Sequence, residues 1–125
     1  METLNFESDA KTPGIDFNAS TGILKLWGRS IPENSMEFYK PVFAWLDNYL
    51  NSPNAKTEMI FQLEYFNTSS SKCILDIFRK IESLNASGKS NVTVKWLYEE
   101  DDEDMMEAGD DYQTIVKLEI QIEQV

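Results

Sequence analysis

The sequence contains no histidine, and this absence excludes several kinds of chemistry. The chain has no imidazole general base, no Ser-His-Asp triad, no histidine phosphorelay site and few options for binding zinc. Its single cysteine, Cys73, cannot form an intramolecular disulfide, and no basic neighbour that would activate the thiol is visible. We therefore expect no metal ion, no cofactor and no enzymatic activity. A carboxylate pair of the glycoside hydrolase type is the remaining alternative, although so small a domain offers little cleft.

Basic residues are also scarce: the chain has 11 Lys and Arg but 22 Asp and Glu, which gives a formal net charge of −11. Such a surface repels phosphate backbones and anionic membranes, so nucleic acid is excluded and a protein partner with a basic patch is favoured. No apolar run approaches the ~20 residues that span a bilayer. The first residues lack the basic and apolar regions of a signal peptide. We expect a cytoplasmic protein without membrane insertion.

The 125 residues, of which 42% are hydrophobic, suit one domain over residues 1–125. Hydrophobic periodicity predicts an α/β fold with a mixed sheet, helices packed on that sheet and the element order ββαβαβαβ. The expected strands are 15–18, 23–28, 57–66, 92–98 and 114–123, and the expected helices are 34–50, 70–85 and a short one that ends at Gly109. Apolar residues on both faces of 57–66 indicate a central strand that is covered on both sides. Core positions are expected for Trp27, Trp45 and Trp96.

Nine carboxylates and no basic residue lie between Glu99 and Asp111. Three interpretations stay open for this acidic run: a solvated loop and helix start, a docking surface for a basic partner, or a divalent metal site. The spacing fails the EF-hand pattern, because Met106 falls at its fifth position. Of Met105 and Met106, one is expected in the core and the other at the surface.

The most informative stretch is the polar string at residues 67–71 (NTSSS), which follows the strand at 57–66 and precedes a helix. Unpaired N–H groups and the positive end of the dipole favour a negative group at a helix N-terminus. Simple N-capping explains one such residue, whereas five small polar residues exceed what a cap needs. We interpret one of these hydroxyls, Thr68 by preference over Ser69, Ser70 and Ser71, as a phosphorylation site. A phosphate there requires that Thr68 be exposed.

Three strings occur together in order: residues 28–35 (GRSIPENS), 63–72 (LEYFNTSSSK) and 101–109 (DDEDMMEAG). Over nearly its whole length the chain thereby resembles the SiaC family of bacterial regulatory phosphoproteins. The element order also resembles the STAS domain of anti-sigma-factor antagonists, so the expected fold is a single STAS-like domain.

The resemblance implies a partner-switching module. In this family a GHKL-type kinase phosphorylates the threonine of the Asn-Thr-Ser-Ser-Ser string, here Thr68, and a PP2C-type phosphatase removes the phosphate. The unphosphorylated form binds and activates a diguanylate cyclase, which links the family to c-di-GMP and biofilm control. The alternative is a constitutive STAS-like scaffold with another effector, such as an anti-sigma factor.

Other polar residues near the string are candidates for partner docking. Arg29, Glu33 and Asn34 lie at a strand-to-helix junction. This junction faces the same edge of the sheet as Thr68 if the strand before it and the strand before Thr68 run parallel. Lys72 is close enough in sequence to pair with a phosphate, and Asn67 and Ser69 flank Thr68. Turn formation and a capping box between Asn34 and Glu37 explain part of this set without function.

Overall fold

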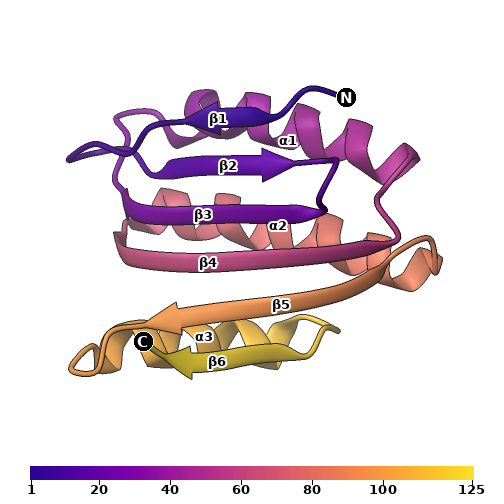
Figure 1. Cartoon of the computed structure of the whole chain (residues 1–125). Coiled ribbons are helices and arrows are strands. Elements are labelled where there is room, and N and C mark those ends of the chain that lie inside the picture. The colour runs from indigo at the N-terminus through magenta and orange to yellow at the C-terminus, as the bar shows by residue number, and fades with distance from the viewer.

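The structure, a computed structural model, describes all 125 residues as one six-stranded sheet with three helices (Figure 1). The elements in chain order are β1 (Leu4–Phe6), β2 (Gly14–Asn18), β3 (Ile23–Ser30), α1 (Ser35–Asn51), β4 (Lys56–Phe66), α2 (Thr68–Ser87), β5 (Asn91–Tyr98), α3 (Glu103–Ile115) and β6 (Ile120–Gln124). The α/β class, the mixed sheet and the helices packed on it are confirmed. The short β1, which adds a strand before the predicted order, was not expected.

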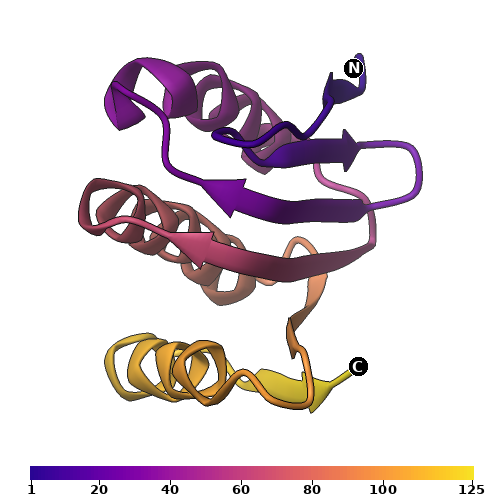
Figure 2. The same ribbon diagram turned by 90° about the vertical axis from the view of Figure 1, so that its left-hand side faces the viewer.

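The strands lie side by side in chain order, from β1 to β6. β2 is antiparallel to both of its neighbours, β1 and β3, and β3, β4, β5 and β6 are parallel. Right-handed crossovers that all advance in the same direction place their helices on the same face of a sheet. Accordingly, α1, α2 and α3 all lie on one face, and no helix covers the other (Figure 2).

The core fills the space between the sheet and the three helices. Its centre is aromatic: the rings of Phe61 and Phe78 stack at 4.7 Å between centroids, and Trp96 lies 5.3 Å from Phe61. The α2 residues buried here recur at helical spacing, as the sequence predicts: Cys73, Ile74, Ile77, Phe78, Ile81 and Leu84. Gly88, at φ 74°, ends this helix as expected.

The prediction that β4 is covered on both faces was wrong. Met59, Phe61 and Leu63 point into the core, whereas the intervening residues are partly exposed on the open face. Ile60 supplied the misleading apolar signal, since it lies in the middle of the sheet between neighbouring strands rather than under a helix. The same open face explains Trp27, which is only half-buried and lies against Gly14 instead of in the core. Trp45 and Trp96 are buried as predicted.

The prediction for the C-terminal elements was also wrong in its boundaries. Gly109 does not end α3, which continues to Ile115, so β6 begins at Ile120 instead of residue 114. Gly109 is a helix-interior residue because the indole of Trp96 lies against it: an added Cβ would be 2.6 Å from Trp96 Cδ1. The glycine therefore serves close packing and not helix termination.

Candidate functional site

The carboxyl ends of β3 and β4 meet at one edge of the sheet, as the parallel arrangement requires. Ser30 and Phe66 are paired at the ends of these strands, and the Asn67 N–H donates to the Ser30 carbonyl at 3.1 Å. Both α1 and α2 begin directly beyond this edge. The expectation that residues 29–34 share an edge with Thr68 is thus confirmed for the backbone.

Asn67 is the N-cap of α2. Its Oδ1 accepts the Ser70 N–H at 2.9 Å and the Ser69 hydroxyl at 3.2 Å, and its carbonyl accepts the Ser71 N–H. The helix therefore starts at Thr68, two residues earlier than predicted. No acidic side chain lies in the first turn, so the positive end of the helix dipole is not neutralised there.

Thr68 is the first residue of α2 and is exposed, as a modification site requires. Its hydroxyl takes part in none of the side-chain hydrogen bonds that hold the neighbouring serines. Ser70 is fully buried, and Ser71 is half-buried with its hydroxyl 3.1 Å from that of Tyr112. Ser69 is exposed, but it bonds both Asn67 and Ser35. Thr68 and Ser69 are thus the two exposed hydroxyls of the string, and Thr68 is the one that bonds no other side chain.

Beneath Thr68 a series of hydrogen-bonded side chains joins β3, α1 and α2. We refer to it as the hydroxyl chain, which consists of Tyr39, Ser30, Ser70, Ser35 and Ser69 and ends on the Asn67 amide. Ser30 and Ser70 are fully buried and Ser35 is 5% exposed. A role for Ser30, Ser35 and Tyr39 was not predicted from the sequence. The available signal was Ser30 at an inward position of β3, in line with Leu24 and Leu26.

The remaining candidates lie around this edge in different ways. Lys72 is exposed one helical turn beyond Thr68, which puts both on one face of α2. Asn34 caps α1 by accepting the Glu37 N–H at 3.2 Å, which is half of the expected capping box, and Glu33 is exposed beside it. Arg29 donates to the Ala10 carbonyl at 3.3 Å and packs over the Tyr65 ring, away from the hydroxyl chain.

The acidic run begins α3. Asp102 is the N-cap, since its carboxylate accepts the Met105 N–H at 3.0 Å, and Glu103 and Asp104 follow in the first turn. These positions stabilise a helix start through its dipole. No group of three or more potential ligands is placed to hold a metal ion, so the metal interpretation gains no support. Met105 is buried and Met106 is partly exposed.

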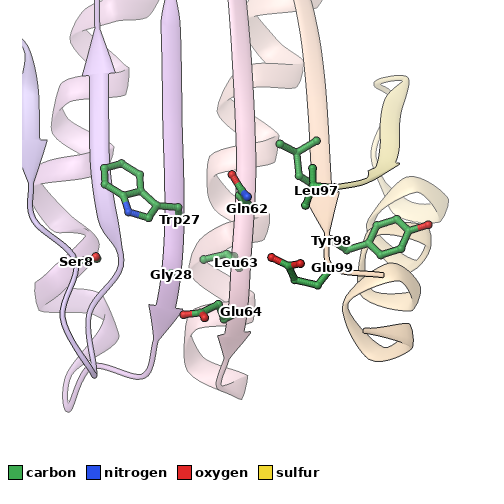
Figure 3. A pocket seen from close by; sticks show the side chains of 10 residues that line it. Ser8, Trp27, Gly28, Gln62, Leu63, Glu64, Leu97, Tyr98 and Glu99 are labelled. Atoms are coloured by element: carbon green, nitrogen blue, oxygen red, sulfur yellow. The ribbon is translucent and has the colours of Figure 1, made fainter. Parts of the chain in front are cut away.

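A shallow pocket lies on the open face of the sheet, where β4 and β5 separate after the pair Phe61–Trp96 (Figure 3). Trp27, Gln62 and Leu97 project into it from three strands. Its lining holds two carboxylate side chains, Glu64 and Glu99, and no basic side chain.

Burial raises the pKa of Tyr112 to about 12, and burial also raises the pKa of Tyr39. An unfolded tyrosine titrates near pH ~10, so above that pH the folded protein binds more protons than the unfolded chain. The free energy of unfolding should therefore hold its full tyrosine contribution below about pH 10 and fall from there toward about pH 12. Urea denaturation across this range would measure the slope, and Tyr39→Phe should flatten it. A slope unchanged by the substitution would contradict this assignment.

None of the three helices has the length and apolar content to cross a membrane.

The fold and the site together define a small α/β domain that presents an exposed threonine at a helix N-terminus. The chain belongs to the SiaC family of regulatory phosphoproteins, whose family model matches residues 6–125.

Individual relatives agree with this assignment. SiaC of Pseudomonas aeruginosa is 27% identical, with a TM-score of 0.89 and full coverage of both chains. A second match, with a TM-score of 0.90 and 28% identity over 98% of this chain and 99% of the other, comes from the structure of the P. aeruginosa diguanylate cyclase SiaD in complex with its activator SiaC. An uncharacterised protein of P. aeruginosa strain UCBPP-PA14 is 30% identical over 112 residues, which are 90% of this chain and 88% of that protein.

Proposed function

We propose that this protein is a cytoplasmic, non-enzymatic phospho-switch whose unphosphorylated form binds and activates a diguanylate cyclase. A GHKL-type kinase phosphorylates Thr68 and a PP2C-type phosphatase reverses the reaction. Support for the effector comes from the likeness to SiaC, which in P. aeruginosa is the activator of SiaD. Support for the site comes from Thr68, the exposed hydroxyl that opens α2 and bonds no other side chain.

Phosphorylation at this position changes the surface without an obvious cost to the fold. It adds about −1.5 to −2 charges and three acceptor oxygens. The helix dipole and the unpaired N–H groups of the first turn stabilise that charge. A partner that docks on unmodified Thr68 meets both added volume and added charge. We propose that the docking face includes the N-cap Asn67, Ser69 and Lys72 of α2, and Glu33 and Asn34 before α1. Arg29 belongs to the same edge through its backbone.

The direct test has two arms. Incubation with the GHKL-type kinase and ATP, followed by intact-mass and fragment analysis, should show one phosphate, on Thr68. In the second arm, adding the unphosphorylated protein to the diguanylate cyclase should raise the rate of c-di-GMP formation from GTP, and the phosphorylated protein should not. Phosphate without an effect on the cyclase would point to another effector, such as an anti-sigma factor. No phosphate would leave a constitutive scaffold.

Lys72 is expected to stabilise the dianionic form of phosphorylated Thr68. A free phosphomonoester has its second pKa at about 6, and an ion pair between positions i and i+4 of a helix contributes about 0.2–0.5 kcal/mol, or roughly 0.1–0.4 pKa unit. Phosphorus NMR titration should thus show a higher second pKa in Lys72→Gln than in the wild type. Lys89→Gln, two residues beyond the C-terminal end of α2, is the matched control and should leave the pKa unchanged. Equal values in both variants would place Lys72 away from the phosphate.

A further inference from the structure

The hydroxyl chain has a defined direction, which follows from counting protons. A serine hydroxyl carries one proton and the Oδ1 of an asparagine only accepts. Ser69 donates its proton to Asn67 Oδ1 at 3.2 Å. The 2.7 Å contact between Ser69 and Ser35 must then use the proton of Ser35. The first turn of α1 is therefore bonded to the first turn of α2 through a buried donor.

The same count of protons determines which hydroxyl is the donor in each remaining contact of the hydroxyl chain. Ser30 donates to Ser70 at 2.8 Å, so the 2.7 Å contact of Ser30 with Tyr39 uses the tyrosine proton. Ser70 is left with its own proton for Ser35, at 3.4 Å. Every proton then points toward Asn67, the residue before Thr68. Burial of Tyr39 keeps its hydroxyl protonated, so the first donor of the series is maintained.

A phosphate on Thr68 introduces a stronger acceptor beside the last link. Hydrogen bonds from a hydroxyl to an anionic oxygen are short and roughly twice as strong as neutral ones. The bond from Ser69 to Asn67 is long, at 3.2 Å, and Ser69 is exposed, so its hydroxyl is free to rotate toward the phosphate. To reach the phosphate, the Ser69 side chain turns about its Cα–Cβ bond, which carries its Oγ away from the Ser35 hydroxyl. Ser35 is too buried to find water in its place.

We propose that the hydroxyl chain transmits the phosphorylation state of Thr68 to the first turn of α1, with Ser69 and Ser35 as positioning residues. This inference rests on the proposed phosphorylation of Thr68 and extends it: the regulated surface includes α1 as well as α2. Met36 follows Ser35 directly and is 58% exposed, with its Sδ 3.8 Å from the Cys73 Sγ. It is thus a reporter placed between the two helices.

The experiment follows the methyl groups of the five methionines by NMR in ¹³C-methyl-labelled protein. Phosphothreonine is introduced at position 68 by genetic encoding, so the result does not depend on any kinase. Phosphorylation should shift the Met36 methyl and leave buried Met59 in β4 unmoved. In Ser69→Ala the Met36 shift should be lost. This substitution is at an exposed position, which protects the fold.

Two variants separate transmission from stability. Ser35→Ala should abolish the Met36 shift, whereas Ser35→Thr, which keeps the hydroxyl, should restore it. The matched control is Ser90→Ala: Ser90 is a buried hydroxyl 2.7 Å from Thr57 at the opposite edge of the sheet, so its loss lowers stability but should leave the shift intact.

A Met36 shift of full size in both Ser69→Ala and Ser35→Ala would show a through-space effect of the charge and overturn the inference. So would the absence of any shift in phosphorylated wild type. Neither result bears on whether a kinase modifies Thr68. With a purified effector, the Kd for the effector can be measured for the phosphorylated and the unphosphorylated protein. Ser35→Ala should reduce the ratio of these two Kd values by about fivefold or more.

Discussion

Replacement of Thr68 by alanine is expected to abolish phosphorylation completely and to lock the protein in its effector-binding form. The fold should be unaffected, because Thr68 is exposed and its hydroxyl bonds no other side chain. Asn67 still caps α2 through its own side chain. Intact mass after the kinase reaction measures the first effect, and cyclase activation in the presence of kinase and ATP measures the second.

The serines of the same string supply the control. Ser69→Ala removes the other exposed hydroxyl and should still accept one phosphate, on Thr68. A phosphate that persists in Thr68→Ala and disappears in Ser69→Ala would move the site by one residue. This outcome would leave the switch in place but correct its position.

A charge at position 68 should mimic part of the modification. Thr68→Asp is expected to weaken effector binding by at least about tenfold, or about 1.4 kcal/mol, since an unpaired charge would be buried in the contact. Thr68→Asn has the same shape without the charge and should bind much more tightly than the aspartate variant. Equal affinities for the two variants would show that Thr68 is not central to docking.

A loss of stability is expected when Gly109 is replaced by alanine. Alanine there gains up to about 1 kcal/mol of helix propensity, but overpacking a core costs about 1–3 kcal/mol. The indole of Trp96 cannot move away, because it is 1% exposed and its Nε1–H donates to the Met105 carbonyl at 2.8 Å. Gly109→Ala should therefore lower the free energy of unfolding by up to about 2 kcal/mol, measured by urea denaturation.

Gly14→Ala is the matched comparison, because Gly14 also lies against an indole. Its partner, Trp27, is half-buried on the open face and is free to shift outward. The loss of stability should thus be smaller than at Gly109. A gain of stability in Gly109→Ala, as at an open helical site, would show that the core relaxes around Trp96.

The elements that were predicted well are those whose signal is local. The apolar stripe of α2, the stop at Gly88 and the cap at Asn34 depend on residues within a few positions of one another, and all three are found as expected. The predicted helix end at Gly109 was wrong because a glycine near a helix end has two physical explanations, helix termination and close packing. Only the presence of Trp96 against it, 13 positions away in sequence, distinguishes packing from termination.

The candidate site also has one feature that the local sequence predicts and others that depend on tertiary contacts. A run of small polar residues between a strand and a helix was enough to place Thr68 at a helix N-terminus. Which of the four hydroxyls is accessible depends on Ser35 and Tyr112, which reach the string from other helices. The hydroxyl chain escaped prediction altogether, because its contacts join residues as many as 40 positions apart.

By itself, the sequence determined the class of fold, the acidic surface, the lack of histidine chemistry and the position of the polar string between β4 and α2. These follow from composition and from periodicities that each segment carries alone. The tertiary structure decided which face of the sheet is open, how far α3 extends, and that α1 and α2 begin side by side and are joined through buried hydroxyls. These features arise from the parallel pairing of β3 with β4 and the direction of the crossovers, which no single segment encodes.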